Sequence, residues 1–296
     1  MADWQNPAYS IDLVLVIDAT ASMSHLIESV KSRALSFHED LTAHIIKSGR
    51  TIDSLRVRAI AFRDFYVDKA AESLVASEFF DLPDERAGFA EFVRGIRASG
   101  GGDAPETGLE GLATAIRSPW AGAGAEQRQV IVLWTDAPAH PLEKNSGAKP
   151  AGYPADMPAS LDELTGLWDR DANHVHPAWK RLLLIAPDVH PWSYLADSWD
   201  ATAHYPSQAG QGLRDTDYES VLAAIAEAAQ DSAWPARKNR TRPAEPAEPT
   251  EPAAPTEPTE PAASPPSDTT AGTAAEPAST GARSHRGARW PWRRAR

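Results

Sequence analysis

Three oxygen-bearing side chains follow an apolar run near the start of the chain. In the segment VLVIDATASMS, residues 14–24, Asp18, Thr20 and Ser22 stand at alternate positions. Such side chains can converge on one hard cation such as Mg²⁺, which takes near-octahedral oxygen ligands. The same pattern also fits a plain turn in which Asp and Ser cap the following helix. From this segment alone both interpretations stay open.

A second oxygen-rich segment, GGGDAPETGLEGL at residues 100–112, carries Asp103, Glu106 and Thr107 behind a glycine run. Glycines permit unusual dihedral angles and close backbone approach. The structural alternative is a loop in which Asp103 or Thr107 caps a helix and Glu106 complements the helix dipole. This segment is a second candidate for cation ligands.

The third segment, VIVLWTDAPAH at residues 130–140, is another apolar run that ends in an acid, Asp136. The three segments occur in the order needed to surround one point above a parallel sheet. Their combination is much more specific than any one of them.

Apolar runs and helical stripes alternate along the first 230 residues. Runs rich in β-branched and aliphatic residues predict buried strands at 11–18, 55–62, 129–136 and 181–187. Apolar residues spaced by three and four predict one helix over 22–47. We expect further helices near 84–97, 107–117, 161–170 and 215–230.

This alternation predicts a doubly wound, mostly parallel sheet flanked by helices. In such sheets, ligands bind beyond the carboxyl ends of the strands. The three oxygen-rich segments fall where such a site is expected.

Composition narrows the chemistry. The chain has no cysteine, so thiolate nucleophiles and Cys-ligated metals are excluded. The whole chain has a net charge of -12. Residues 237–296 have ten Lys and Arg against seven Asp and Glu, so the net charge of residues 1–236 is more negative than that of the whole chain. We therefore expect no nucleic-acid binding by the folded domain. With no apolar stretch long enough to cross a bilayer and no signal-like start, we expect no transmembrane segment and a cytoplasmic protein.

We expect three regions along the chain: a domain over 1–236, a linker over 237–266 and a disordered basic tail over 267–296. Within the linker, proline falls at every third position from 243 to 261, with five glutamates between. Polyproline II has three residues per turn, which predicts an extended strut. The Arg- and Trp-rich end is either a solvated terminus or a peptide that docks a partner or an anionic surface.

The three oxygen-rich segments resemble the metal-ion-dependent adhesion site of von Willebrand factor A domains, over about residues 10–232. D-x-T-x-S is similar to that family's D-x-S-x-S. The D-A-P-E and T-D-A-x-x-H motifs are most similar to integrin β I-like domains and related bacterial A domains.

The resemblance implies that Thr20, Ser22 and Glu106 bind the metal directly, as Mg²⁺ or Mn²⁺. It implies that Asp18 and Asp136 hold it through bound waters.

Other roles in the resemblance stay open. Thr107 could take the place of Glu106 as the ligand from the second segment. Asp103 is a secondary candidate that orients its loop or touches a neighbouring ion. The second, regulatory cation of integrin β domains needs two acids where this chain has His25 and Leu26, so we expect no such ion.

The resemblance implies a protein-binding module, not an enzyme, whose metal binds an acidic group of a partner protein. One alternative is an A-type scaffold that binds partners without metal. Another is a phosphotransferase similar to haloacid dehalogenases, with Asp18 as the nucleophile, although Thr20 stands where those enzymes have a second Asp.

Several weaker signals point mainly to structure. Arg63 and Asp64 could pair with each other to fix the rim of the site, or form a plain surface pair. The scattered histidines lack a compact zinc-binding spacing. The tryptophans are expected to pack in the core or under loops and not to form a stacking platform. Segment 137–160 follows the third motif and could form a rim or lid.

Overall fold

The computed structural model describes residues 8–47, 49–102, 104–122, 127–143, 149–169, 174–213 and 217–230. Asp103, the predicted linker over 237–266 and the predicted tail over 267–296 lie outside the described residues. The predicted strut and its partner-docking terminus therefore stay predictions.

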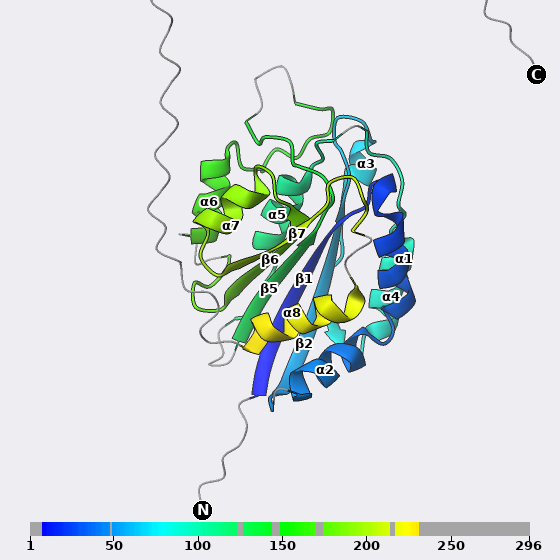
Figure 1. The fold of residues 1–296 in the computed structure, drawn as a ribbon, viewed down its shortest axis with the longest axis vertical. Coiled ribbons are helices and arrows are strands. Elements are labelled where there is room, and N and C mark those ends of the chain that lie inside the picture. Colours follow the sequence, from blue (N-terminus) through cyan, green and yellow to red (C-terminus); the bar gives the residue numbers. More distant parts are fainter. Residues whose placement is uncertain are drawn as a thin grey trace, which may run out of the picture. The chain divides into compact units, whose positions relative to one another are not determined.

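A mostly parallel, seven-stranded sheet forms the centre of the described chain (Figure 1). Its order is β3-β2-β1-β5-β6-β7, and β4 also pairs with β2. The parallel strands are β1 (Ala8–Asp18), β2 (Thr51–Phe62), β5 (Gln127–Trp134), β6 (Lys180–Pro187) and β7 (Thr202–Ser207). The short strands β3 (Leu74–Ala76) and β4 (Phe80–Leu82) run antiparallel to β2. The predicted fold class is confirmed.

Helices cover both faces of the sheet (Figure 1). One face packs against α1 (Ser24–Arg33), α2 (Phe37–Lys47), α4 (Arg86–Gly95) and α8 (Tyr218–Gln230). The other packs against α5 (Gly108–Ile116), α6 (Leu161–Asp169) and α7 (Trp192–Ser198). The short helices η1 (Ala21–Met23) and α3 (Ala70–Ser73) lie in the loops that follow β1 and β2.

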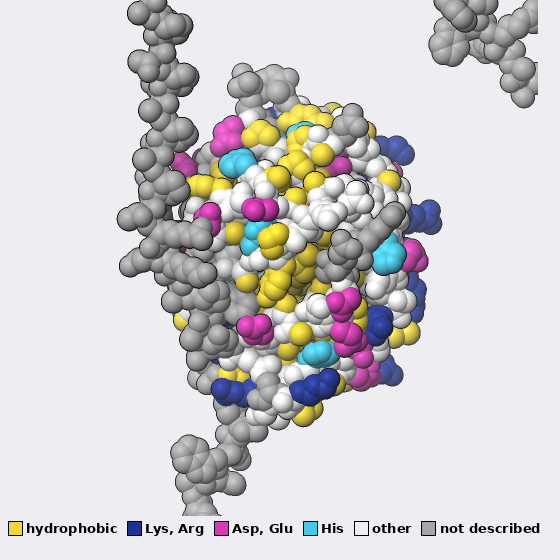
Figure 2. All heavy atoms as spheres, in the orientation of Figure 1, with side chains coloured by type: hydrophobic (Ala, Val, Ile, Leu, Met, Phe, Trp, Pro, Cys, Tyr) yellow, Lys and Arg dark blue, Asp and Glu magenta, His cyan; other side chains and the backbone are white. Residues whose placement is uncertain are grey.

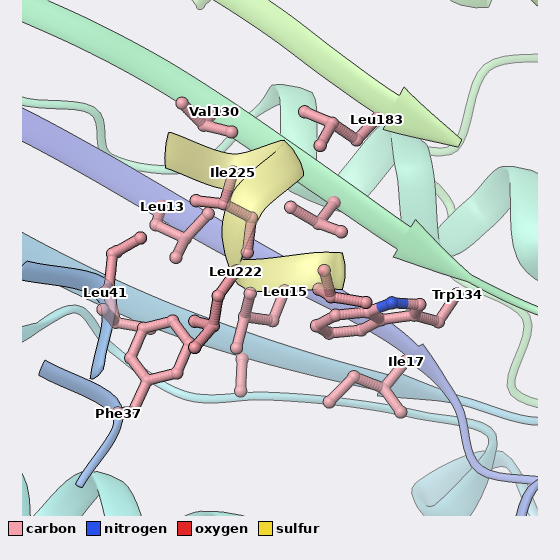
Figure 3. Packing of buried hydrophobic residues seen from close by; sticks show 14 of the residues in the cluster. Leu13, Leu15, Ile17, Phe37, Leu41, Val130, Trp134, Leu183, Leu222 and Ile225 are labelled. Carbon is pink, nitrogen blue, oxygen red and sulfur yellow. The ribbon is translucent and has the colours of Figure 1, made fainter. Parts of the chain in front are cut away.

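Strand β1 divides its side chains between the two cores because successive residues point to opposite faces. Leu13, Leu15 and Ile17 belong to the core beneath α8. Figure 3 shows Leu13 and Leu15 near Ile225 and Leu222, and Ile17 near Trp134. Val14 and Val16 face the opposite core. This arrangement explains why the run LVLVI shows no polar alternation.

The strand register brings the chemistry-bearing loops to one edge. Asp18 at the end of β1 pairs with Phe62 at the end of β2, and Ile17 pairs with Trp134 at the end of β5. The carboxyl ends of these three strands are therefore level. The loops that follow them all emerge on the same side of the domain.

The single helix predicted over residues 22–47 is wrong in one respect, because the chain turns at residues 34–36 between α1 and α2. The Ser36 hydroxyl donates to the carboxylate of Asp40 at 2.9 Å and to the carbonyl of Arg33 at 3.2 Å. A serine that bonds locally in this way competes with the helical pattern. Ala34 and Phe37 stay buried on either side of the break, so the apolar stripe itself is correct.

None of the described helices is both long and apolar enough to cross a membrane.

Candidate metal centre

The loops that follow β1, β2 and β5 form one edge of the domain, here called the loop edge. Asp18 lies at the base of this edge and is completely buried. Its Oδ1 accepts hydrogen bonds from the backbone N–H of Thr20 at 2.9 Å and from the Thr20 hydroxyl at 2.6 Å. Its Oδ2 accepts a 2.7 Å bond from the hydroxyl of Thr135. Both carboxylate oxygens are thus engaged, which fixes the side chain between the β1 and β5 loops.

A chain of hydrogen bonds continues from Asp18 to the third motif. The hydroxyls of Thr20 and Ser22 lie 3.2 Å apart, and the Ser22 hydroxyl donates to Asp136 Oδ1 at 2.9 Å. Four of the five residues predicted as principal ligands are therefore brought together. Asp136 joins the other three from 114 residues further along the chain than Ser22.

Asp136 is also held from a direction that the motifs did not predict. Its Oδ2 accepts the backbone N–H of Gly212 at 2.7 Å, and its carbonyl accepts that of Gly210 at 2.8 Å. Gly212 has a positive φ of 64°, and an added Cβ there would collide with the Ser22 carbonyl. The segment before α8 can approach this closely because it has no side chain at that position.

Glu106 enters the site from the loop between α4 and α5. Its backbone N–H donates to the Pro138 carbonyl at 2.9 Å, and its carbonyl accepts from His140 at 2.8 Å. These bonds tie the second motif to the third. Its side chain also lies close to the first motif across Gly101. An added Cβ on Gly101 would lie 2.8 Å from both Glu106 Oε1 and Thr20 Cγ2.

The Glu106 carboxyl is buried, with 4% of the residue exposed, and its Oε2 has no hydrogen-bond partner among the described residues. Burial raises its pKa to about 8, and the charges of four aspartates add to the effect. These are Asp18, Asp64, Asp68 and Asp136. Carboxylates crowded in this way resist ionisation unless positive charge is supplied.

Burial also raises the pKa of Asp18, to about 6. The hydrogen bonds from Thr20 and Thr135 oppose this rise, and the charge of Asp136 adds to it. The arrangement therefore holds more negative charge than its hydrogen-bond donors neutralise. Together with two hydroxyl oxygens, this donor set suits a hard divalent cation.

The two secondary candidates have different outcomes. The Thr107 hydroxyl accepts the backbone N–H of Phe65 at 2.9 Å, so it joins the second motif to the loop after β2. Asp103 lies outside the described residues.

In the described part of the chain, Arg63 does not form the predicted ion pair with Asp64. Its guanidinium donates to three backbone carbonyls instead, those of Ala19 at 3.2 Å, Glu72 at 2.6 Å and Arg97 at 2.8 Å. These carbonyls belong to three separate loop segments. A planar five-donor group can bridge them as a lysine could not.

Two further acids, Asp64 and Asp68, contribute to the site although the motifs did not single them out as ligands. Asp68 Oδ2 accepts the Gly101 N–H at 2.9 Å, which fixes the glycine loop above Glu106. Asp64 Oδ1 lies 3.2 Å from His140 Nε2. The signal for both was their place directly after β2, a strand that ends level with β1.

Among the described residues, no three side chains of His, Cys, Asp or Glu form a cluster that could hold a metal by themselves. The predicted set differs in kind, because two of its three direct ligands are hydroxyls. Of the tryptophans predicted to pack in the core or under loops, Trp134, Trp168, Trp192 and Trp199 are buried. Trp179 is partly buried and stacks on the ring of His176.

Segment 137–160 borders the site in its described parts. The Tyr153 ring packs edge-on against Phe65 with centroids 5.3 Å apart, and its hydroxyl donates to Glu110 at 2.7 Å. The residues after the third motif therefore reach the loop after β2. A rim or lid for a partner stays a prediction.

The mostly parallel sheet, its helical layers and the loop edge fit a von Willebrand factor A-like fold. No protein-family model matches the chain. The chain is 30% identical over 156 residues to the alpha-protein kinase vwkA of Dictyostelium discoideum, an alignment that covers 52% of this chain and 23% of that protein. It is 33% identical over 133 residues to the putative ariadne-like RING finger protein R811 of Acanthamoeba polyphaga mimivirus, covering 44% and 11%. The chain thus spans less than a quarter of either relative.

Solved structures show more distant similarity. The pilus adhesin SpaC of Lactobacillus rhamnosus GG matches at 12% identity and a TM-score of 0.46, over 76% of this chain and 31% of that one. The vWF domain of the pilus tip protein Mfa5 of Porphyromonas gingivalis matches at 18% identity and a TM-score of 0.29, over 45% and 40%. Similarity at this level does not define a function.

Proposed function

We propose that this chain is a metal-dependent protein-binding module of the von Willebrand factor A type. A Mg²⁺ or Mn²⁺ ion at the loop edge would bind an acidic side chain of a partner protein. The observation that carries the proposal is the buried Glu106 carboxylate, whose Oε2 lacks a partner among the described residues. It lies beside a hydrogen-bonded chain of two hydroxyls and two aspartates.

The residues at this edge fit such an ion. Thr20, Ser22 and Glu106 would hold it directly, while Asp18 and Asp136 would act through bound water. The ion supplies the positive charge that Glu106 needs in order to ionise, since burial and neighbouring acids raise the pKa of that side chain to about 8.

A carboxylate is the ligand class that such a centre favours. Two of the three direct protein ligands are neutral hydroxyls, so the charge of the cation is only partly neutralised. The only guanidinium described beside the site, that of Arg63, donates to backbone carbonyls and is 9% exposed. Attraction for an acidic partner would therefore come from the ion.

Binding is a better proposal than catalysis. A nucleophilic aspartate needs an oxygen that can reach its substrate, whereas both oxygens of Asp18 accept hydrogen bonds and the residue is fully buried. The hydroxyl of Thr20, which stands in the place of a second acid, donates a hydrogen bond to Asp18. The phosphotransferase alternative therefore has no support from this geometry.

The test is titration calorimetry of Mg²⁺ and Mn²⁺ into EDTA-stripped protein, comparing wild type with Glu106→Ala. We expect one saturable site in the wild type and its loss in the variant. Glu163→Ala is the matched control, because Glu163 lies on α6 and caps its own helix through the N–H of Ala159. It should bind metal as the wild type does.

Two outcomes would contradict the proposal. If the wild type binds neither ion, the scaffold that acts without metal becomes the better explanation. If Glu106→Ala and the wild type bind equally well, the ion sits elsewhere.

A further inference from the structure

Two exposed apolar side chains stand beside the candidate metal centre. Tyr66 and Val67, in the loop after β2, are 44% and 59% exposed. Figure 2 shows hydrophobic side chains on the upper part of the molecule, the end that carries the loop edge. Single exposed hydrophobics are common on protein surfaces. The position of this pair sets it apart.

Gly101 and Gly102 connect the surroundings of the pair with those of Glu106. An added Cβ on Gly102 would lie 3.0 Å from Val67 Cγ2, and one on Gly101 would lie 2.8 Å from Glu106 Oε1. The Gly101 N–H donates to Asp68, the residue after Val67, at 2.9 Å. The loop that carries the pair and the loop that carries Glu106 are therefore locked together.

The pair is also held in place by its own loop. The backbone N–H of Tyr66 donates to Asp64 Oδ1 at 2.8 Å, and that of Val67 donates to the Asp64 carbonyl at 3.3 Å. The ring of Tyr66 packs on that of His140 with centroids 4.5 Å apart. A surface fixed in advance loses little conformational entropy when a ligand binds.

We propose that Tyr66 and Val67 form an apolar subsite for the residue next to the metal-bound carboxylate. The partner would present an Asp or Glu adjacent to a large aliphatic or aromatic side chain on an exposed segment. This inference rests on the proposed function and specifies the partner. It follows from position and polarity together. The acidic centre accepts a carboxylate only through the ion, and the exposed side chains of Tyr66 and Val67 beside it are hydrophobic.

The test selects random seven-residue peptides displayed on phage against the EDTA-stripped protein reloaded with Mg²⁺. We expect wild type to enrich Asp or Glu next to Leu, Ile, Phe, Tyr or Trp. The variant Tyr66→Ser with Val67→Ser should keep the acid and lose the apolar neighbour. It should bind the wild-type peptide at least about tenfold more weakly, since one buried apolar side chain contributes at least that factor.

The matched control is Tyr205→Ser with Val75→Ser, which removes the same residue types at exposed positions on β7 and β3. It should behave as the wild type. Calorimetric Mn²⁺ titration should give the same affinity for all three proteins.

Each result has a distinct meaning. Enrichment of an acid without an apolar neighbour would overturn the subsite and leave the proposed function intact. Loss of Mn²⁺ binding in the Tyr66 and Val67 variant would also overturn it, because the pair would then serve the metal loops. Peptides without an acid, no enrichment at all, or binding unchanged by EDTA would overturn the proposed function itself.

Discussion

Replacing Glu106 with glutamine should stabilise the metal-free protein and remove its response to metal. Glutamine keeps the shape of the side chain but carries no charge. In the wild type, folding must either protonate Glu106 or bury its charge among four aspartates, because the pKa rises from 4.5 to about 8. The variant avoids this cost.

The size of the effect follows from linkage. A pKa that rises this far corresponds to roughly 3 kcal/mol at pH 7. Solvent at the loop edge screens part of it, so we expect Glu106→Gln to raise the free energy of unfolding by about 2 kcal/mol in EDTA. In a domain of this size that is an increase in melting temperature of roughly 4–8 °C.

Magnesium should reverse the order. At a hundred times its dissociation constant, an ion that binds only the folded state adds about 2.7 kcal/mol. Wild type should gain this, and Glu106→Gln should gain almost nothing. The assay is chemical unfolding in urea at pH 7, with EDTA or with MgCl₂ at matched ionic strength.

The reasoning is refuted if glutamine destabilises the protein in EDTA, because Glu106 would then be an ordinary structural acid. It is refuted equally if MgCl₂ stabilises both proteins by the same amount.

Three other predictions follow. The pKa of Asp18 is raised to about 6, so the folded state binds this proton more tightly than the unfolded state does. Asp18 should therefore make the stability of the metal-free protein fall as the pH rises from about 4 to above 6. Urea midpoints across that range, without metal, test this, and a rise in the midpoint would contradict it. Gly101→Ala should weaken Mn²⁺ binding at least about tenfold in calorimetry, because φ at Gly101 is 71° and the new methyl group would meet Glu106. Gly166→Ala is the control and should leave Mn²⁺ binding unchanged, since no atom lies within 4 Å of the added methyl group. Arg63→Ala should lower the free energy of unfolding in urea by about 3 kcal/mol, because three carbonyls lose a charged donor. Arg86→Ala removes one partner of an exposed ion pair and should lower it by under about 1 kcal/mol. Equal losses would argue against the role of Arg63.

The core of the fold could be predicted because the buried strands are written as continuous apolar runs. All eight residues of β5 and of β6 are buried, and the signal comes from the apolar runs VIVLW and LLLIA that follow their polar first residues. Strand β7 carries almost none. It is a half-exposed edge strand with the sequence TAHYPS, and its proline is tolerated because an edge strand has a free side.

The candidate site could be predicted as far as its residues stand at strand ends. Asp18 and Asp136 stand at the ends of buried strands, and the parallel register places these strand ends side by side. Gly212 and Arg63 could not be predicted in their observed roles, because each acts through backbone contacts with segments distant in the chain. The break at Ser36 was missed for a related reason, since a local side-chain bond interrupts an otherwise regular stripe.

The link between Gly212 and Asp136 has a consequence for synthesis of the chain. During synthesis Asp18 is added first, and Glu106 and Asp136 follow. The N–H group that donates to Asp136 Oδ2 belongs to Gly212, which is added later still. A nascent chain that ends before this point has every predicted ligand but lacks the segment that orients one of them. The acid cluster is therefore complete only with a residue that lies 76 positions after Asp136 in the chain. We expect the proposed ion to bind tightly only to a chain that includes this segment.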